Sequence, residues 1–536
     1  MLTIRDLALP AQHDPSMLLY LAANALRIPT SEISAVKIRR RSLDARKKDR
    51  IQYIYTVDVS TLHSENRILK QCRNPRVSLS KADSYRPPKA TVLPDTRPVV
   101  VGFGPGGMFA ALALALAGLR PIIMERGQDA VARHEAVTRF WQTGVLDPES
   151  NVQFGEGGAG TFSDGKLNTG IKNERMGWIL RQLVEAGADE SILYDAKPHV
   201  GTDVLLTVVQ NVRKRILALG GEVRFETKLI GLRQENGRLV GAELESRDGK
   251  TSVLPCEKLI LAPGHSARDT FQMLLAAEIP MEPKPFSIGV RIEHLQSDLN
   301  DAQYGPHWRE LGLPPADYKL SVHLPDGTSA YTFCMCPGGA VVGAASEPGR
   351  VVTNGMSNFS RDGENANAAV LVTLNPADFP DKSVLGGMYW QMEIESAAFR
   401  AGGGNYRAPA QLVGDFLSRR ESREIRKVRP TCLPGVTLCD LHGVLPERIT
   451  GVLEQAIPAF GKQLSIFDDP DAVMTAPETR SSSPVRILRS AALQSPALEG
   501  LFPCGEGAGF AGGIISAAAD GLLCAEALIA SLSGQK

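Results

Sequence analysis

Residues 99–111 read Val-Val-Val-Gly102-Phe-Gly104-Pro-Gly-Gly107-Met-Phe-Ala-Ala, a strand-like run that meets three spaced glycines and continues into an apolar helix. In this G-x-G-x-x-G pattern the first glycine permits a tight turn, the second lets the backbone approach a pyrophosphate, and the third lets helix and strand pack closely. A second strand follows and ends in Glu125, 18 residues after Gly107. A carboxylate in that place accepts hydrogen bonds from ribose hydroxyls. The pattern predicts a dinucleotide site, and Glu125 disfavours the 2′-phosphate of NADP.

A second glycine-rich segment lies near the C-terminus and reads Gly505-Glu506-Gly-Ala-Gly-Phe-Ala-Gly512-Gly513-Ile514. With it the chain resembles the glutathione-reductase-like FAD-dependent oxidoreductases, and in particular a bacterial group of largely uncharacterised FAD-dependent dehydrogenases. The resemblance implies that Glu506, where the family commonly has Asp, contacts the ribityl chain of FAD. It also implies that a helix N-terminus points at the flavin pyrimidine, where its free amides and partial positive charge suit a reduced flavin.

These segments predict an α/β fold: a Rossmann-type FAD-binding domain with an inserted antiparallel-sheet (α+β) domain and a small N-terminal α+β domain. The predicted domains are an accessory unit over residues 1–92, the first part of the FAD-binding domain over 93–280, the insert over 281–440, and the C-terminal part of the FAD-binding domain over 441–536.

Hydrophobic periodicity and turn residues predict elements within these domains. We expect N-terminal strands over 2–8, 33–41 and 51–59, and a proline-containing linker over 85–89. Antiparallel strands are expected within 222–254, short strands over 287–293, 330–336 and 370–374, and a helix over 512–532. The charges of residues 419–429 alternate in sign, which is typical of an exposed helix.

Two weaker segments support the same cofactor. Residues 154–167 form another glycine loop, and residues 261–268 form a strand-end turn. In the resembled family these positions lie beside the pyrophosphate and the adenosine half of FAD. Together the four segments predict these cofactor-binding residues: Gly102, Gly104, Pro105, Gly106, Gly107, Glu125, Arg126, Gly157, Gly158, Gly160, Thr161, Lys166, Gly264, Arg268, Gly505, Glu506, Gly512, Gly513 and Ile514.

Four residues are candidates for catalysis: Arg480, Cys334, Cys336 and His265. Arg480 stands among hydroxyl side chains before the C-terminal glycine segment. This setting suits a residue that binds a carboxylate or the edge of the flavin, and it equally suits a residue of a solvated loop. In an extended strand Cys334 and Cys336 share one face with their Cα atoms nearly 7 Å apart, at the edge of disulfide geometry. They are therefore a redox dithiol or two small buried side chains. His265 is a proton donor or an ordinary turn residue.

The whole-chain charge predicts few electrostatic partners. The 536 residues include 59 basic and 59 acidic side chains, so no net field attracts the molecule to nucleic acid. We therefore expect a small-molecule substrate, with transient NAD(P)H or a protein as electron donor, and consider nucleic acid an improbable partner.

Location and metal content are predicted from what the sequence lacks. The longest apolar run has 12 residues, from Met108 to Leu119, and crossing a bilayer needs about 20. A secretory signal and a C-x-x-C pair are both missing. We expect a cytoplasmic protein without a membrane span, a disulfide framework or a metal site.

The function predicted from the sequence is that of an FAD-dependent dehydrogenase or reductase, which transfers a hydride through flavin N5 to or from an unidentified small organic substrate. A second strand-GxGxxG-helix unit for stable NAD(P)H binding is missing. Two rivals stay open. The basic runs 39–41 and 46–48 suit a flavin-dependent RNA-modifying enzyme, and a non-catalytic flavin-binding protein would carry the same cofactor segments.

Overall fold

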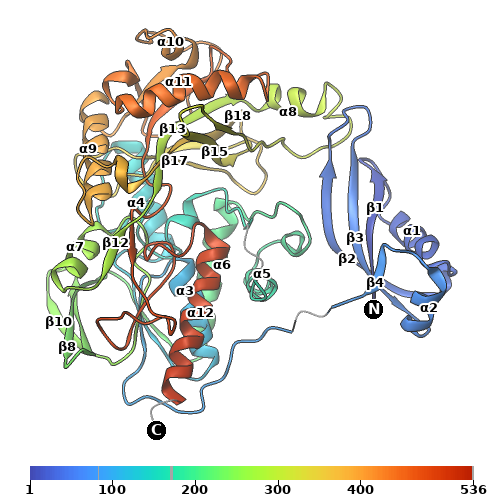
Figure 1. Cartoon of the computed structure of the whole chain (residues 1–536), viewed down its shortest axis with the longest axis horizontal. Coiled ribbons are helices and arrows are strands. Elements are labelled where there is room, and N and C mark those ends of the chain that lie inside the picture. The colour runs from blue at the N-terminus through green and yellow to red at the C-terminus, as the bar shows by residue number, and fades with distance from the viewer. Residues whose placement is uncertain (82–83, 169–172, 534–536) are drawn as a thin grey trace.

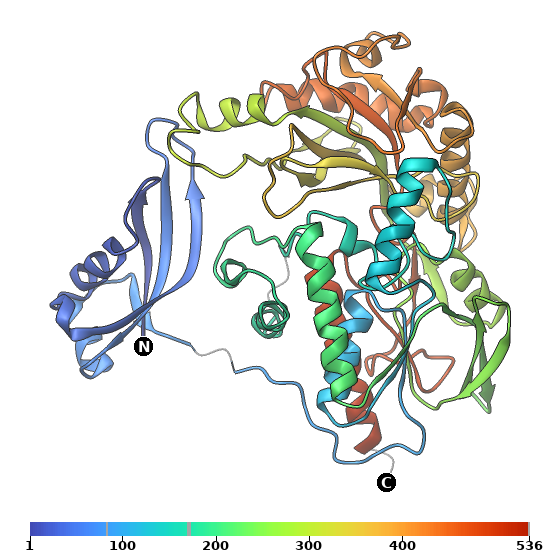
Figure 2. The same ribbon diagram turned by 180° about the vertical axis from the view of Figure 1, so that it is seen from behind.

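The computed structural model describes residues 1–81, 84–168 and 173–533. Figures 1 and 2 show a small N-terminal domain joined by a long linker to a larger body, and the larger body consists of a parallel-sheet domain and an antiparallel-sheet domain. The predicted fold class is confirmed.

The N-terminal domain is a four-stranded antiparallel sheet with strand order β2-β3-β1-β4. Two helices pack on one face of the sheet, over a core that includes Leu2, Ile4 and Val57. This is the split β-α-β arrangement. The three predicted strands are confirmed, and α2 and β4 were not predicted. The elements are β1 (Leu2–Pro10), α1 (Met17–Leu26), η1 (Thr30–Glu32), β2 (Ile33–Asp44), β3 (Gln52–Thr61), α2 (Glu65–Cys72) and β4 (Val77–Leu79).

The parallel domain has a five-stranded sheet with the order β23-β11-β5-β6-β7. This is the doubly wound order, in which ligands bind beyond the carboxyl ends of the central strands. Its sheet and helices are β5 (Val99–Val101), α3 (Pro105–Leu116), β6 (Ile122–Met124), α4 (Ala130–Thr143), η2 (Ala159–Phe162), α5 (Met176–Glu185), η3 (Glu190–Leu193), α6 (Thr202–Ala218), β7 (Glu222–Arg224), β11 (Leu259–Leu261), α7 (Arg268–Ala276), β23 (Leu501–Pro503) and α12 (Ile514–Ser533).

Two small antiparallel sheets accompany the parallel sheet. The antiparallel strands predicted within 222–254 are confirmed as β8 (Thr227–Glu235), β9 (Arg238–Ser246) and β10 (Thr251–Pro255), but residues 222–224 form β7 of the parallel sheet instead. A second pair, β12 (Met281–Pro283) and β22 (Val485–Ile487), links the two ends of the inserted domain.

The inserted domain is built on a seven-stranded sheet with the order β14-β15-β18-β13-β21-β19-β20. Helix α11 packs on its apolar face. The elements are β13 (Phe286–Leu295), α8 (Gln296–Tyr304), β14 (Ser321–His323), β15 (Ser329–Cys336), β16 (Ala340–Gly343), β17 (Thr353–Met356), β18 (Asn365–Leu374), η4 (Pro376–Asp378), α9 (Gly386–Ala401), β19 (Ala408–Leu412), α10 (Val413–Leu417), β20 (Val436–Leu438), η5 (Leu441–Gly443), α11 (Glu447–Gly461) and β21 (Val473–Glu478).

Two sequence predictions about this domain need correction. Its predicted end at residue 440 is too early, because β21 pairs with β13 and β19 inside the seven-stranded sheet. The segment 419–429 is irregular rather than helical, since its side chains bond to the neighbouring helices α10 and α11. Arg419 bonds to Glu454 at 2.8 Å, and Ser422 Oγ donates to Asp415 at 2.8 Å. Of the predicted 441–536 segment, residues 534–536 lie outside the described part.

Helix α12 is long and apolar enough to cross a membrane by length and composition alone. However, 61% of its apolar window is buried inside the protein, where it packs closely on α3. A Cβ atom on Gly521 would lie 2.0 Å from the carbonyl oxygen of Gly106. The apolar character of α12 is therefore explained by its place in the core of the parallel domain.

Candidate functional site

A cavity of about 1010 Å³ lies between the parallel domain and the antiparallel domain. Its size is at the upper end of the roughly 300–1,000 Å³ that small-molecule and cofactor sites occupy. The start of α3 forms one wall, the start of α12 another, and strand β15 of the inserted domain a third. A site of this size at the carboxyl edge of a doubly wound sheet suits an extended, partly anionic ligand.

The two glycine-rich segments meet in this cavity although some 400 residues separate them. A Cβ on Gly106 would lie 3.5 Å from the Cys504 sulfur and 3.7 Å from the Cα of Gly505. Helix α3 begins at Pro105 and α12 at Ile514, and both residues line the cavity. Since the first amides of a helix have no partner within it, both starts present donors and partial positive charge to a bound anion.

Four glycines on the cavity wall face open space. A Cβ built on Gly264, Gly505, Gly512 or Gly513 would meet no protein atom within 4 Å. In contrast, a Cβ on Gly102 would lie 2.1 Å from the Ala262 carbonyl oxygen, and the residue has φ +92°. Gly102 therefore serves the turn itself. Of the four open positions, Gly264, Gly505 and Gly513 also have positive φ, and only Gly512 has a backbone conformation that other residues adopt.

Glu125 and Arg126 form one end of the cavity. The Glu125 carboxylate accepts backbone N–H bonds from Phe103, Gly127 and Gly155, each at 2.9 Å, and keeps room for one further donor. Arg126 lies with its guanidinium carbon 4.1 Å from the centroid of the Phe154 ring.

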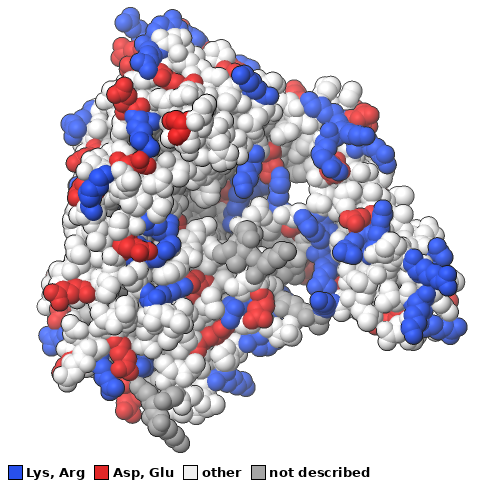
Figure 3. Space-filling view, in the orientation of Figure 1, with Lys and Arg blue, Asp and Glu red and all other residues white. Residues whose placement is uncertain are grey.

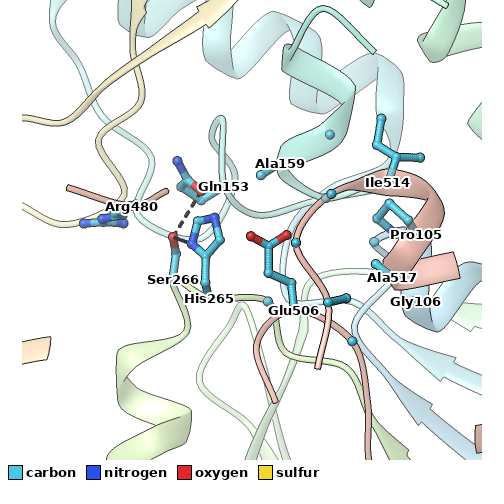
Figure 4. A pocket seen from close by; sticks show the side chains of 18 of the residues that line it. Pro105, Gly106, Gln153, Ala159, His265, Ser266, Arg480, Glu506, Ile514 and Ala517 are labelled. Atoms are coloured by element: carbon cyan, nitrogen blue, oxygen red, sulfur yellow. Dashed lines mark hydrogen bonds between the residues drawn. The ribbon is translucent and has the colours of Figure 1, made fainter. Parts of the chain in front are cut away.

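Glu506 projects into the middle of the cavity. In Figure 4 its carboxylate lies between the His265–Ser266–Gln153 group and the start of α12. Burial raises the pKa of Glu506 to about 7, against the lowering effects of the Gly513 backbone and of Lys284. The group therefore exchanges its proton near neutral pH.

His265 is an uncharged base on the opposite side. Its Nδ1 lies 2.9 Å from Ser266 Oγ, which donates to Gln153 at 3.1 Å. Burial, together with the charges of Arg480 and Arg268, lowers the pKa of His265 to about 4. At neutral pH the imidazole is therefore neutral, which does not fit the predicted role of proton donor.

Comparisons with known proteins agree with the cofactor expected for this geometry. The family model "FAD-dependent protein, C-terminal domain-like" matches residues 285–481, and a domain of unknown function matches residues 1–60. An uncharacterised protein of Clostridium beijerinckii is 46% identical over 530 residues, which covers 98% of each chain. The chain belongs to this FAD-dependent protein family.

Solved structures give only distant likenesses to this family member. The flavin-dependent brominase Bmp2 is 12% identical over 82% of this chain and 80% of that chain, with a TM-score of 0.38. A geranylgeranyl bacteriochlorophyll reductase-like protein from Thermoplasma acidophilum is 12% identical over 81% and 78% of the two chains, with a TM-score of 0.37.

Most residues predicted from the sequence lie on the cavity wall of this FAD-dependent family member. They are Gly102, Gly104, Pro105, Gly106, Glu125, Arg126, Gly158, Gly160, Lys166, Gly264, His265, Cys334, Arg480, Gly505, Glu506, Gly512, Gly513 and Ile514. Their roles toward FAD stay predictions.

Five predicted residues lie behind the wall: Gly107, Gly157, Thr161, Arg268 and Cys336. A Cβ on Gly107 would lie 1.9 Å from the Gly102 carbonyl oxygen, which fits its packing role in the motif. Gly157 and Thr161 contact each other instead, since a Cβ on Gly157 would lie 2.1 Å from Thr161 Oγ1.

Arg268 and Arg480 belong to a buried ion cluster centred on Glu395 of α9. Arg268 donates to the Glu395 carboxylate at 2.7 and 2.8 Å, and Arg480 donates to it at 2.8 and 3.0 Å. Arg268 is thus a structural residue that joins α7 to the inserted domain, not a cofactor ligand. Arg480 is only 3% exposed, and four of its five N–H groups bond within the protein.

The two cysteines do not have the regular strand geometry assumed in the prediction. A β-bulge separates Phe333 from Cys336, Cys334 has φ +43°, and both thiols are free. Cys336 Sγ donates to the Cys334 carbonyl oxygen at 3.2 Å, and buried Arg291 donates to the same oxygen at 2.8 Å. Arg291 thereby fixes the turn that presents Cys334 to the cavity.

The Cys334 thiol is expected to react as a thiolate at neutral pH. Interaction with Cys336, together with the charges of Arg291 and Lys166, lowers the pKa of the Cys334 thiol well below its usual value. Iodoacetamide should therefore alkylate Cys334 as fast at pH 7 as at pH 9. Peptide mass spectrometry measures both rates. Cys439 is the internal control, because burial raises its pKa to about 11 and it should stay unmodified at pH 7. A Cys334 rate that still climbs between pH 7 and 9 would contradict the assignment.

Some wall residues were missed by sequence reasoning. Four residues of the inserted domain line the cavity: Lys284, Lys319, Asn354 and Glu478. Glu478 forms a buried two-bond pair with Arg291, at 2.6 and 2.8 Å. An arginine within the mostly apolar run 286–292 was the available signal, because a charge in a buried strand needs a partner.

Proposed function

We propose that this protein is a flavoenzyme that holds FAD in the cavity and oxidises or reduces a small organic substrate. The observation that carries the proposal is the meeting of two helix N-termini, those of α3 and α12, with the open glycine positions between them. One anionic dinucleotide with a charge-accepting ring would use both helix ends at once.

Different residues of the chain would contact different parts of the proposed cofactor. The start of α3, at Pro105 and Gly106, would hold the pyrophosphate. Glu125, with one acceptor position left, would take a ribose hydroxyl. The start of α12 would favour negative charge on the ring.

When bound, FAD supplies hydride transfer, and the protein supplies position and proton exchange. Glu506, whose pKa lies near 7, holds or releases a proton in the middle of the cavity. Neutral His265 offers a ring nitrogen as a hydrogen-bonding group on the other side. The substrate would contact the wall that β15 and its bulge form, which includes Thr332, Phe333 and Cys334.

A visible spectrum of the purified protein tests the cofactor, and a reductant screen tests the activity. We expect flavin absorbance, release of FAD on denaturation, and bleaching under argon by NADH, NADPH or a reduced electron-transfer protein. A preparation that stays colourless after reconstitution with FAD would overturn the cofactor assignment. A yellow protein that every physiological reductant leaves oxidised would instead identify a non-catalytic flavin-binding protein.

A further inference from the structure

We infer that the open face of the N-terminal sheet binds the phosphate backbone of a folded RNA. The first observation is that the N-terminal domain is basic and the rest of the chain acidic, although the net charge of the whole chain is zero. Residues 1–81 contain 15 Lys and Arg but only 7 Asp and Glu, a net charge of +8, so the remainder of the chain carries −8. A basic domain on an acidic body is the electrostatic footprint of a nucleic-acid-binding module.

Strand register places the cations on the face that the helices leave uncovered. Lys37 pairs with Asp58, and Arg40 pairs with Thr56. Directly paired residues share a face, and the neighbouring Val57 faces the helices in the domain core. Lys37 and Arg40 are both exposed and therefore stand on the open face.

A third cation on this face is held in a fixed position. Arg39 donates to Asp58 at 3.1 Å and to Ser80 Oγ at 3.1 Å. Thr3 and Ser80 also donate to Asp58, at 2.5 and 3.0 Å. Asp58 thus orients the Arg39 guanidinium, whose side chain stays 42% exposed, and a preorganised guanidinium loses less entropy on binding phosphate.

The domain is fastened to the larger body along its edge strand β2 and at the tip of the β2–β3 hairpin. Arg41 on the edge strand β2 bonds to Asp195 at 2.7 and 2.9 Å, and its backbone carbonyl accepts from Ala196 at 2.8 Å. At the tip of the hairpin, Ile51 is buried in the core of the inserted domain. Figures 1 and 2 show α1 and α2 on the outer side and the strands on the side of the larger body.

Basic side chains line both rims of the opening between the N-terminal domain and the larger body, as Figure 3 shows. On the body side, Lys166, Lys197 and Lys319 line the cavity, and Lys197 follows directly after the docking segment 194–196. Lys197, which is paired with Asp317 at 2.6 Å, thus brings the cavity wall close to the edge strand of the N-terminal sheet. The binding itself does not depend on the proposed flavin chemistry.

The composition of the face favours RNA over an acidic protein. A protein interface has an apolar core, whereas the paired positions here are Thr3, Lys37, Arg40, Thr56 and Asp58. Cations spaced among hydroxyls match phosphates and the 2′-hydroxyls that distinguish RNA from DNA.

Filter binding of the full-length protein to bulk tRNA across a salt series tests the inference. With about four phosphate contacts, the affinity should fall about 100-fold as salt rises from about 50 to 200 mM. The double variant Lys37→Glu with Arg40→Glu should reduce the affinity at low salt and lower the salt slope by about 2. Its matched control is Arg67→Glu with Lys70→Glu on the outer helix α2, where both residues are exposed, and this control should bind like the wild type.

Three results would overturn the inference. They are tRNA binding without salt dependence, equal weakening by the two double variants, and equal affinity for tRNA, duplex DNA and polyglutamate. The last result would reduce the face to an unspecific polyanion site. Because the assay reads RNA retention, a colourless protein that still binds tRNA would overturn only the flavin proposal.

Discussion

Replacing Gly512 by leucine is expected to abolish FAD retention while leaving the fold intact. Gly512 lines the cavity at the start of α12, and a Cβ there would meet no protein atom within 4 Å. Its φ lies outside the left-handed region, so a larger residue is not strained by the backbone. The added side chain would occupy cavity space and shield the first amides of α12. We expect the dissociation constant for FAD to rise at least about 100-fold, the equivalent of about 2.7 kcal/mol.

The matched control is Gly451→Leu on α11. A Cβ on Gly451 also meets nothing within 4 Å, and its φ is likewise outside the left-handed region, but the residue lies away from the cavity. Flavin titration by fluorescence quenching measures the affinity of both variants, and thermal unfolding of the FAD-free proteins checks the fold. Normal FAD retention by a folded Gly512→Leu protein would contradict the placement of the cofactor.

Local chemistry explains which parts of this site were predictable from the sequence. The turn at Gly102 needs a glycine because φ is +92° and the Ala262 carbonyl lies where a Cβ would be. Such a requirement is visible in the local sequence, within a few residues of the turn. The strand, turn and helix around residues 99–111 were therefore predicted correctly, and so was the matching segment before α12.

Long-range pairing explains what the sequence could not give. Arg268 and Arg480 stand beside glycine motifs and were assigned to cofactor or substrate. Their partner Glu395 is 127 residues from Arg268 and 85 residues from Arg480. The sequence near the two arginines does not indicate it. The end of the inserted domain was misplaced for the same reason, since β21 pairs with β13 far upstream.

The net charge of the N-terminal domain is hidden in the total charge of the chain, although the basic runs 39–41 and 46–48 are visible in the sequence. The formal charge of the chain is zero, and the expectation against nucleic acid rested on that total. The strand register adds that Lys37 and Arg40 lie on one face, and RNA binding at that face is our proposal.

Glu395→Ala is expected to be the most destabilising single substitution at the junction of the two large domains. Its carboxylate is fully buried and accepts bonds from Arg268, Arg480 and Thr479. Although burial alone would raise the pKa of Glu395, the two guanidinium groups hold it well below its usual value. Removing the carboxylate leaves two buried cations with Glu347 as their shared acid. Breaking a buried ion pair in this way costs about 3–5 kcal/mol.

Thermal unfolding followed by circular dichroism measures this loss, and we expect a fall of roughly 10 °C in the midpoint at pH 7. The exposed Glu393, two residues earlier on α9, gives the matched control Glu393→Ala, which should change stability by less than about 0.5 kcal/mol. Because the folded pKa of Glu395 lies below its unfolded value of 4.5, its contribution is present above that pH and is lost as the pH falls further. The gap between wild type and Glu395→Ala should therefore narrow in acid. A gap below about 1 kcal/mol at pH 7 would show that Glu347 alone compensates both arginines, and that Glu395 does not hold the domains together.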